Sequence, residues 1–368
     1  MTIPGESAPR GVAYYVTAHG YGHGVRSCDI ICALNKLYPK LPVVIVSDHP
    51  ASFFRNRLGE GPYTVRPGSF DFGMVQLDSI RVNVQESLKS VLQLYDHRKE
   101  LVAQETEFLR SHGIGLVVVD IPGIPLESAE SLGIPRIAVG NFSWDWIYSA
   151  YVAADPRWES LVRLYQDEYS KADLLLRLPF SPEMNAFPRI EDIPLVASPG
   201  QNRRCEIAGL TGADFRKEWI LVSFTTLEWN DEALDNVAKL DACEFFAVLP
   251  LEWRRMNIHS IDRDVICYSD VVASMDGVIT KPGFGILSDC LVNKKPLIYA
   301  DRSDFLEYTV LEAAIKKYFK HQHIPAEKLY RGEVGEAIEN LWSQPEPSMT
   351  LASGGATIAA GRMREYLD

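Results

Sequence analysis

The start of the chain carries the pattern that most restricts its fold. An apolar, β-branched run at residues 12–16 leads into a turn with three glycines at residues 17–24, and a second apolar run covers residues 42–46. Apolar residues at helical spacing lie between the two runs: Ile30, Ala33, Leu34 and Leu37. This order predicts a βαβ unit with parallel strands. Because glycine allows close backbone approach and a helix N-terminus attracts anions, the turn is a candidate ligand-binding loop.

Strand-like and helix-like stretches alternate along the rest of the chain. The expected strands are residues 116–120, 135–139, 173–178, 219–224, 244–249, 277–280 and 296–300. The expected helices are residues 77–109, 121–132, 231–240, 286–292, 305–317 and 326–342. A proline-rich stretch at residues 179–204 divides them. The pattern predicts the α/β class with two parallel-sheet domains.

The length of the chain predicts the number of domains, and its net charge disfavours some classes of binding partner. The 368 residues suit two domains, expected at residues 1–180 and 205–345, with a linker at 181–204 and a helical tail at 346–368. With 37 basic against 49 acidic residues, the net charge of −12 argues against non-specific binding of nucleic acid or anionic membranes. No signal peptide or membrane-spanning run is recognisable, so a cytoplasmic location is expected. The oligomeric state is not indicated.

The cysteines do not indicate a metal site. The six cysteines include no C-x-x-C pair, which favours buried small apolar residues over a disulfide or metal ligands. We therefore expect no metal and no cofactor. Ligands of open parallel sheets bind beyond the carboxyl ends of the strands, so the expected site is a cleft between two facing domains.

The first glycine turn contains His19 and His23 beside Gly20 and Gly22. Histidine titrates near neutral pH, so either ring is a candidate base. A dinucleotide site is disfavoured because the third glycine of G-x-G-x-x-G is missing. A tight turn with incidental histidines is the structural alternative.

A second glycine loop joins a predicted strand to a helix. It offers Lys281, Gly283, Phe284 and Gly285 at a helix N-terminus, which suits a diphosphate, although it is not a P-loop. Ser288 and Asp289 follow in the helix, where the acid can bind a ribose or simply favour the helix dipole. The hydroxyls of Ser223 and Thr225, after another strand, are weaker phosphate-binding candidates.

Aromatic and acidic residues follow two further strands. Asn141, Trp144, Asp145 and Trp146 suit a sugar, whose apolar face stacks on an indole while its hydroxyls bond to the polar side chains. The alternative is two core aromatics with a helix-capping acid. Asp120 ends an apolar strand and is a further candidate for the cleft.

Three blocks carry a family resemblance. Residues 14–23, 140–148 and 276–291 resemble, in the same order, blocks of the glycosyltransferase-like N-terminal half of plant arabinokinases. The chain is more loosely similar to the GT-B glycosyltransferases, such as the lipid II-forming N-acetylglucosaminyltransferase. The resemblance implies the GT-B fold, with the acceptor on the first domain and the nucleotide-sugar on the second. Nothing here resembles the phosphate loop of the arabinokinase kinase half.

The resemblance also implies roles for residues. Those assigned to the nucleotide-sugar are Lys281, Gly283, Gly285, Ser288 and Asp289, with Asp301, Arg302 and Glu307, from the stretch 301–307, at the donor sugar. His19, Gly20, Gly22 and His23 would approach the sugar and diphosphate from the other domain. Relatives commonly have Gly-Thr-x-Ser-Glu where this chain has Gly285-Ile286-Leu287-Ser288-Asp289, which puts the ribose contact in question.

We therefore expect a metal-independent, inverting glycosyltransferase that uses a nucleotide-diphosphate sugar, with a UDP-sugar favoured, and moves a hexosyl or pentosyl group to an unidentified acceptor. The candidate bases are His19, His23, Asp120 and Asp145, with His19 first because a glycine loop holds it at the sheet edge. A non-catalytic nucleotide-sugar-binding module and a nucleotide-sugar epimerase are the alternatives.

Overall fold

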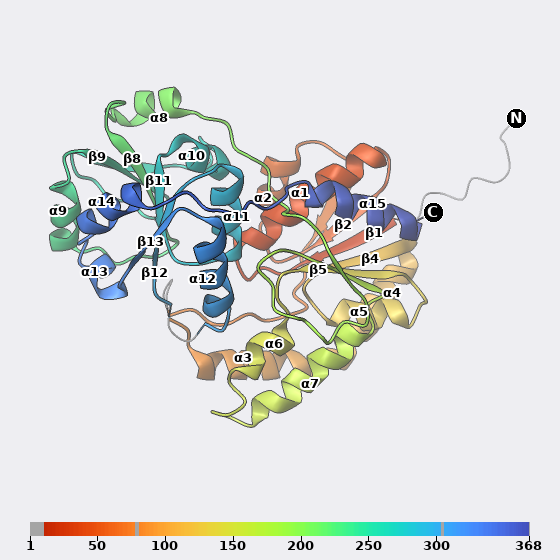
Figure 1. The fold of residues 1–368 in the computed structure, drawn as a ribbon. Coiled ribbons are helices and arrows are strands. Elements are labelled where there is room, and N and C mark those ends of the chain that lie inside the picture. Colours follow the sequence, from red (N-terminus) through yellow and green to blue (C-terminus); the bar gives the residue numbers. More distant parts are fainter. Residues whose placement is uncertain (1–10, 78–80, 303–304, 368) are drawn as a thin grey trace, which may run out of the picture. The chain divides into compact units, whose positions relative to one another are not determined.

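The protein forms two compact units, each built on a parallel sheet (Figure 1). The computed structural model describes residues 11–77, 81–302 and 305–367. Unit 1 comprises Met1–Val75, Asn83–Val196 and Ala352–Asp368, and unit 2 comprises Gln76–Val82 and Ala197–Leu351. The predicted α/β class with two parallel sheets is confirmed.

The sheet of unit 1 has the order β3-β2-β1-β4-β5-β6-β7, and neighbouring strands pair in parallel. Its strands are β1 (Gly11–Val16), β2 (Val43–Val46), β3 (Tyr63–Arg66), β4 (Ile114–Asp120), β5 (Arg136–Gly140), β6 (Leu174–Arg177) and β7 (Ile190–Asp192). Both β1 and β4 are buried along their whole length, as expected for apolar strands covered on both faces. Val16 lies opposite Asp120, so β1 and β4 end at the same level.

The helices of unit 1 include the last one of the chain. They are α1 (Tyr21–Leu37), α2 (Ala51–Leu58), α3 (Val84–Asp96), α4 (Arg98–Ser111), α5 (Ile124–Glu130), α6 (Trp144–Ser149), α7 (Arg157–Ser170) and α15 (Gly355–Leu367). Gly20 precedes α1 with φ of 117°, a conformation that favours glycine. Helix α15 packs against α1, and Ala359, Ala360 and Met363 lie in one core with the apolar face of α1 (Figure 1).

Unit 2 has a six-stranded parallel sheet of order β10-β9-β8-β11-β12-β13. Its strands are β8 (Glu218–Ser223), β9 (Cys243–Val248), β10 (Ile258–Ile261), β11 (Gly277–Thr280), β12 (Leu297–Ala300) and β13 (His321–Ile324). Its helices are α8 (Arg204–Thr211), α9 (Asp231–Ala238), α10 (Tyr268–Ser274), α11 (Phe284–Val292), α12 (Glu307–Tyr318), α13 (Ala326–Tyr330) and α14 (Gly335–Ser343).

The unit boundaries differ from those expected from the sequence. Strand β7 falls within the expected linker and pairs with β6, so unit 1 extends to Val196. The expected helical tail also belongs to unit 1, because the backbone N–H of Leu195 donates to Ala352 O at 3.0 Å and α15 then continues onto α1. The chain therefore enters unit 1 again after completing unit 2.

Two long expected helices are each interrupted. The stretch 77–109 contains α3 and α4, which meet at His97, while residues 78–80 lie outside the described residues. The stretch 326–342 contains α13 and α14, separated by Gly332 with φ of 69°. In the part of the chain that the structure describes, no helix combines the length and apolar character needed to cross a membrane.

Candidate functional site

The sheet of unit 1 brings several predicted residues together at its carboxyl edge. β1 lies between β2 and β4, and β5 follows β4, so the segments after these strands start at one edge. The backbone N–H of Thr17 donates to Asp120 O at 2.8 Å, which joins the glycine turn to the end of β4. Asn141 follows β5 directly. The structure thus places the first glycine turn, Asp120 and Asn141 next to one another.

His23 and Asp120 form a buried pair. Nδ1 of His23 lies 2.8 Å from Oδ1 of Asp120, and the His23 side chain retains 9% of its exposure. Ser27 donates from Oγ to Oδ2 of the same carboxylate at 3.1 Å. The edge of the His23 ring meets Phe142 with centroids 5.5 Å apart. Asp120 therefore orients His23 through one ring nitrogen.

Arg26 completes this cluster from the next turn of α1. Its Nε donates to Asp120 Oδ2 at 2.6 Å, a terminal nitrogen donates to Asp120 Oδ1 at 2.5 Å, and the other donates to Asn141 Oδ1 at 2.6 Å. The residue is 7% exposed. We did not select Arg26 from the sequence, although its spacing of three residues from His23 places both on one helix face.

Burial and charge shift the pKa values of this cluster in opposite directions. Burial alone would raise the pKa of Asp120, but the charges and hydrogen bonds of Arg26 and His23 bring it down to about 2. Burial lowers the pKa of His23, and Arg26 lowers it further against the opposing effect of Asp120. At neutral pH the cluster therefore contains an ionised acid and a neutral imidazole.

His19 lies in a separate set of contacts built around Asp71. Thr17 donates from Oγ1 to Asp71 Oδ1 at 3.0 Å, and Trp144 donates from Nε1 to Asp71 Oδ2 at 2.7 Å. The His19 ring packs edge-on against Trp144 at 5.2 Å. It also lies so close to Gly73 that a Cβ there would stand 1.9 Å from the ring. His19 thus packs between Trp144 and Gly73.

Asp71 is the buried acid that sequence reasoning missed. Burial raises its pKa to about 6, although the hydrogen bonds from Trp144 and Thr17 act in the opposite direction. The residue lies five positions beyond β3, at the same edge as Thr17. The short strand before it, with the sequence YTVR, gave no apolar run from which the sequence could have placed this acid at the sheet edge.

The prediction that Trp144 stacks on a sugar is wrong, because the ring is 1% exposed. It lies parallel to Tyr148 at 5.6 Å, with Phe142 at its edge. Asp145, a candidate base, is also buried, and burial raises its pKa. Trp146 is partly exposed and stays a prediction as the stacking residue.

His49 is a third histidine at this edge, and the sequence reasoning passed over it. It follows β2 and is stacked against Tyr21, with centroids 5.0 Å apart and an interplanar angle of 20°. Phe53 lies on the same aromatic cluster and approaches Gly24, where a Cβ would meet its ring at 2.5 Å. The glycine at position 24 is therefore required for packing. Burial lowers the pKa of His49.

The carboxyl edge of unit 2 carries the second glycine loop. Strand β11 pairs with β8 and β12, with Ser223 opposite Thr280 and Thr280 opposite Tyr299. Lys281 follows Thr280, and α11 begins at Phe284 after Gly283, which provides no side-chain cap. Helix N-terminal N–H groups without a side-chain cap suit an anion. Thr225 is exposed beyond β8, while Ser223 hydrogen-bonds to the partly buried Tyr268.

The other residues that were predicted to bind the nucleotide-sugar differ in their surroundings. Ser288 donates to Phe284 O at 2.8 Å within α11, and Asp289 follows it in the helix. Arg302 is buried, donates to Pro282 O at 3.0 Å and lies over the Phe305 ring. Arg302 thus braces the glycine loop.

Asp301 lies directly after β12 and has a histidine partner. Its Oδ1 is 2.7 Å from Nε2 of His323 on β13. Glu307 begins α12. Of the predicted stretch 301–307, residues 303 and 304 lie outside the described residues.

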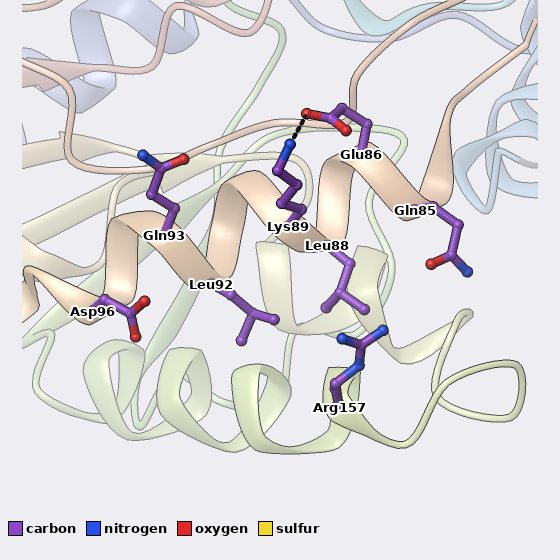
Figure 2. A pocket seen from close by; sticks show the side chains of 8 residues that line it. All are labelled: Gln85, Glu86, Leu88, Lys89, Leu92, Gln93, Asp96 and Arg157. Carbon is purple, nitrogen blue, oxygen red and sulfur yellow. Dashed lines mark hydrogen bonds and ion pairs between the residues drawn. The ribbon is translucent and has the colours of Figure 1, made fainter.

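A surface hollow lies elsewhere in unit 1, between α3 and the start of α7 (Figure 2). Figure 2 shows Leu88 and Leu92 on the side of α3 that faces Arg157, with Lys89 paired to Glu86 on another side. The lining contains none of the predicted site residues. Within residues 11–77, 81–302 and 305–367, no group of three or more His, Cys, Asp and Glu side chains is arranged to hold a metal.

Comparison with known proteins gives a relative in sequence and several similar solved structures. No family model matches the chain. An L-arabinokinase of Arabidopsis thaliana is 29% identical over 359 residues, which are 96% of this chain and 34% of that protein. The chain therefore spans about a third of the length of this relative.

Several solved structures of glycosyltransferases have a similar fold. A UDP-glucosyltransferase from Polygonum tinctorium has a TM-score of 0.62 at 14% identity, covering 99% of each chain. Arabidopsis thaliana UGT89C1 has a TM-score of 0.62 at 13% identity over 97% of this chain and 94% of its own. The calicheamicin glycosyltransferase CalG4 has a TM-score of 0.61 at 14% identity, covering 98% of this chain and 94% of its own. At these identities the likeness shows the fold, and the chain has the GT-B fold of these glycosyltransferases.

Proposed function

We propose that this protein is a glycosyltransferase that moves a sugar from a nucleotide-diphosphate sugar to an acceptor hydroxyl, with His23 as the general base. The pair of His23 and Asp120 carries this proposal, because a neutral imidazole held by an ionised carboxylate at the carboxyl edge is arranged to accept a proton. The GT-B fold supports the reaction class. His19 was the first-ranked base from the sequence; His23 is preferred here because its Nδ1 lies 2.8 Å from the buried carboxylate of Asp120, which orients the ring.

The reaction balances with these groups. Nε2 of His23 takes the proton of the acceptor hydroxyl while that oxygen forms a bond to the anomeric carbon. The bond from this carbon to the diphosphate breaks, and the diphosphate leaves with the electron pair. A single direct displacement inverts the anomeric configuration and needs one base and no nucleophile.

Unit 2 supplies the donor-binding groups in this proposal. Lys281 and the N–H groups at the start of α11 would offset the charge that develops on the diphosphate. This positive clamp is the reason to expect a metal-independent reaction. UDP-sugars are the favoured donors because the solved relatives include a UDP-glucosyltransferase and a transferase in complex with UDP.

The departure at Ile286 and Asp289 favours a second candidate, a nucleotide-sugar-binding module without turnover. Ile286 lies in the first turn of α11 and offers no hydroxyl to a phosphate. Asp289 is one methylene shorter than the usual glutamate. This candidate predicts binding that does not depend on His23.

The test measures nucleoside diphosphate release from a panel of UDP-, GDP- and dTDP-sugars, with and without pooled hydroxyl acceptors. We expect acceptor-dependent release that EDTA does not reduce, and a loss of about 10²- to 10⁴-fold in His23→Gln. His112→Gln, an exposed histidine at the end of α4, is the matched control.

Three results would redirect the proposal. Full activity in His23→Gln, with loss in His19→Gln, would return the base role to His19. A thermal shift with one nucleotide but no release would support the binding module, since a ligand at 100 times its Kd adds about 2.7 kcal/mol. Isomerised sugar without acceptor would support an epimerase.

A further inference from the structure

Arg26 is a buried cation that the proposed reaction does not use directly. All three of its nitrogens donate. Nε donates to Oδ2 of Asp120, one terminal nitrogen donates to Oδ1 of Asp120, and the other terminal nitrogen donates to Oδ1 of Asn141. The terminal nitrogen that contacts Asp120 also lies 2.8 Å from Nδ1 of His23. A bidentate arginine and carboxylate pair is among the stronger and geometrically most specific ion pairs in proteins.

We propose that Arg26 is a positioning residue that keeps His23 neutral, with its proton on Nδ1 and its lone pair on Nε2. The proposal concerns the charge and tautomer of His23 and holds whether or not the protein transfers sugars. Its catalytic consequence rests on the proposed function.

The tautomer follows from the carboxylate. Oδ1 of Asp120 lies 2.8 Å from Nδ1, and an ionised carboxylate can only accept hydrogen bonds. A lone pair on Nδ1 would face this negative oxygen, whereas an N–H there donates to it. The Arg26 nitrogen that also lies 2.8 Å from Nδ1 already donates to the same carboxylate oxygen at 2.5 Å, so the carboxylate remains the acceptor that both groups share. In neutral imidazole the other nitrogen is then the acceptor. The structure gives Nε2 no hydrogen bond to any residue in the described ranges.

The charge follows from Arg26. An isolated aspartate beside a histidine favours the imidazolium, because opposite charges attract. Here Asp120 already has a cation on both oxygens, and a second positive charge on His23 would lie beside the guanidinium. Asp120 therefore orients the ring while Arg26 opposes its protonation.

The other groups around His23 do not reverse this balance. His49, across from α1 at the end of β2, would oppose a charge on His23 if it were itself protonated. Ser27 on α1 donates to Asp120, and Phe142 after β5 presents a ring. Asp120 on β4 is the one group in this set that favours the charged ring.

The consequence is a preference for the group bound at Nε2. A nitrogen lone pair accepts from a hydroxyl and repels a carboxylate or phosphate oxygen. With the proposed function, the acceptor therefore presents a neutral hydroxyl to His23, and the base stays unprotonated at lower pH than an ordinary histidine.

The test is NMR titration of the full chain with isotope-labelled histidine, with the His23 signals assigned by comparison with His23→Gln. In the wild type we expect a His23 titration midpoint below the ordinary value of about 6.5 and an unprotonated Nε2 at neutral pH. In Arg26→Met we expect the midpoint to rise, because Asp120 loses its cation. Arg57→Met is the control, since Arg57 pairs with Asp29 instead.

Each outcome decides the proposal without any substrate. A wild-type midpoint at or above about 6.5, a proton on Nε2, or an unchanged midpoint in folded Arg26→Met overturns it. If Arg26→Met does not fold, Arg26→Lys is the second variant, because lysine keeps the positive charge but cannot donate to both carboxylate oxygens as the guanidinium does. The titration midpoint of His23 in the wild type tests the proposal without any variant of Arg26. An inactive protein with the expected titration would reject the proposed function and leave this inference intact.

Discussion

The buried carboxyl of Asp71 contributes to the pH dependence of the stability of unit 1, and Asp71→Asn should remove that contribution. Asp71 is 5% exposed, and burial raises its pKa from the ordinary 3.8 to about 6. Each pKa unit corresponds to about 1.4 kcal/mol, so ionising Asp71 costs the folded state about 3 kcal/mol relative to the unfolded chain. The substitution keeps the shape, and the amide oxygen can still accept from Trp144.

The sign follows from proton counting. Between pH 3.8 and about 6 the folded state binds more protons at Asp71 than the unfolded chain does, so the free energy of unfolding falls as pH rises. Below this window both states are protonated and the contribution is constant. The stability of Asp71→Asn relative to wild type should therefore increase by about 2.4 kcal/mol between pH 4 and pH 7.5.

Hydrogen exchange measured on peptides from β1, a strand buried in the core of unit 1, reports the opening of that unit. Asp48→Asn is the matched control, since Asp48 is an exposed acid at the same edge and its removal should give no comparable trend. A relative stability that stays constant across this range, or falls as pH rises, would refute the reasoning.

Three further predictions concern the same edge. Asp120→Asn should cost about 3–5 kcal/mol in urea unfolding, because Arg26 would remain buried without its counter-charge, and a cost below about 1 kcal/mol would contradict the buried pair. Gly24→Ala should lower the free energy of unfolding by about 1–3 kcal/mol, because a Cβ would stand 2.5 Å from a phenylalanine ring. Gly209→Ala, in an exposed helix, should raise it by up to about 1 kcal/mol, and equal melting temperatures for the two variants would contradict this difference. Trp146→Ala should raise KM for the sugar-bearing substrate without lowering the melting temperature, and an unchanged KM would remove its predicted stacking role.

The alternation of apolar runs and helical patterns was sufficient to predict both parallel sheets. Strands such as β4 are short, continuous apolar runs, and this pattern is typical of a buried parallel strand. Strand β13, with the sequence HQHI, was missed because it pairs with one neighbour at the sheet edge and is only partly buried. Strand β7 was missed because prolines surround it.

The site was predicted less completely than the fold. The segments after the strands were correctly located, because strand order places them at one edge. The partners of their side chains depend on long-range contacts, such as Trp144 with Asp71, 73 residues apart in the chain. Whether Trp144 offers its ring to a ligand or to the core is decided by such contacts, and the local sequence permits both.

The position of α15 has a consequence for the order in which the protein folds during synthesis. Its buried residues complete the core that β1 and α1 begin, yet the ribosome adds them only after the whole of unit 2. Domains commonly fold as units while the chain emerges, with the N-terminal one first. Until then the part of α1 that packs against α15 stays uncovered, and the core beneath the histidine turn is completed only after unit 2 has been made.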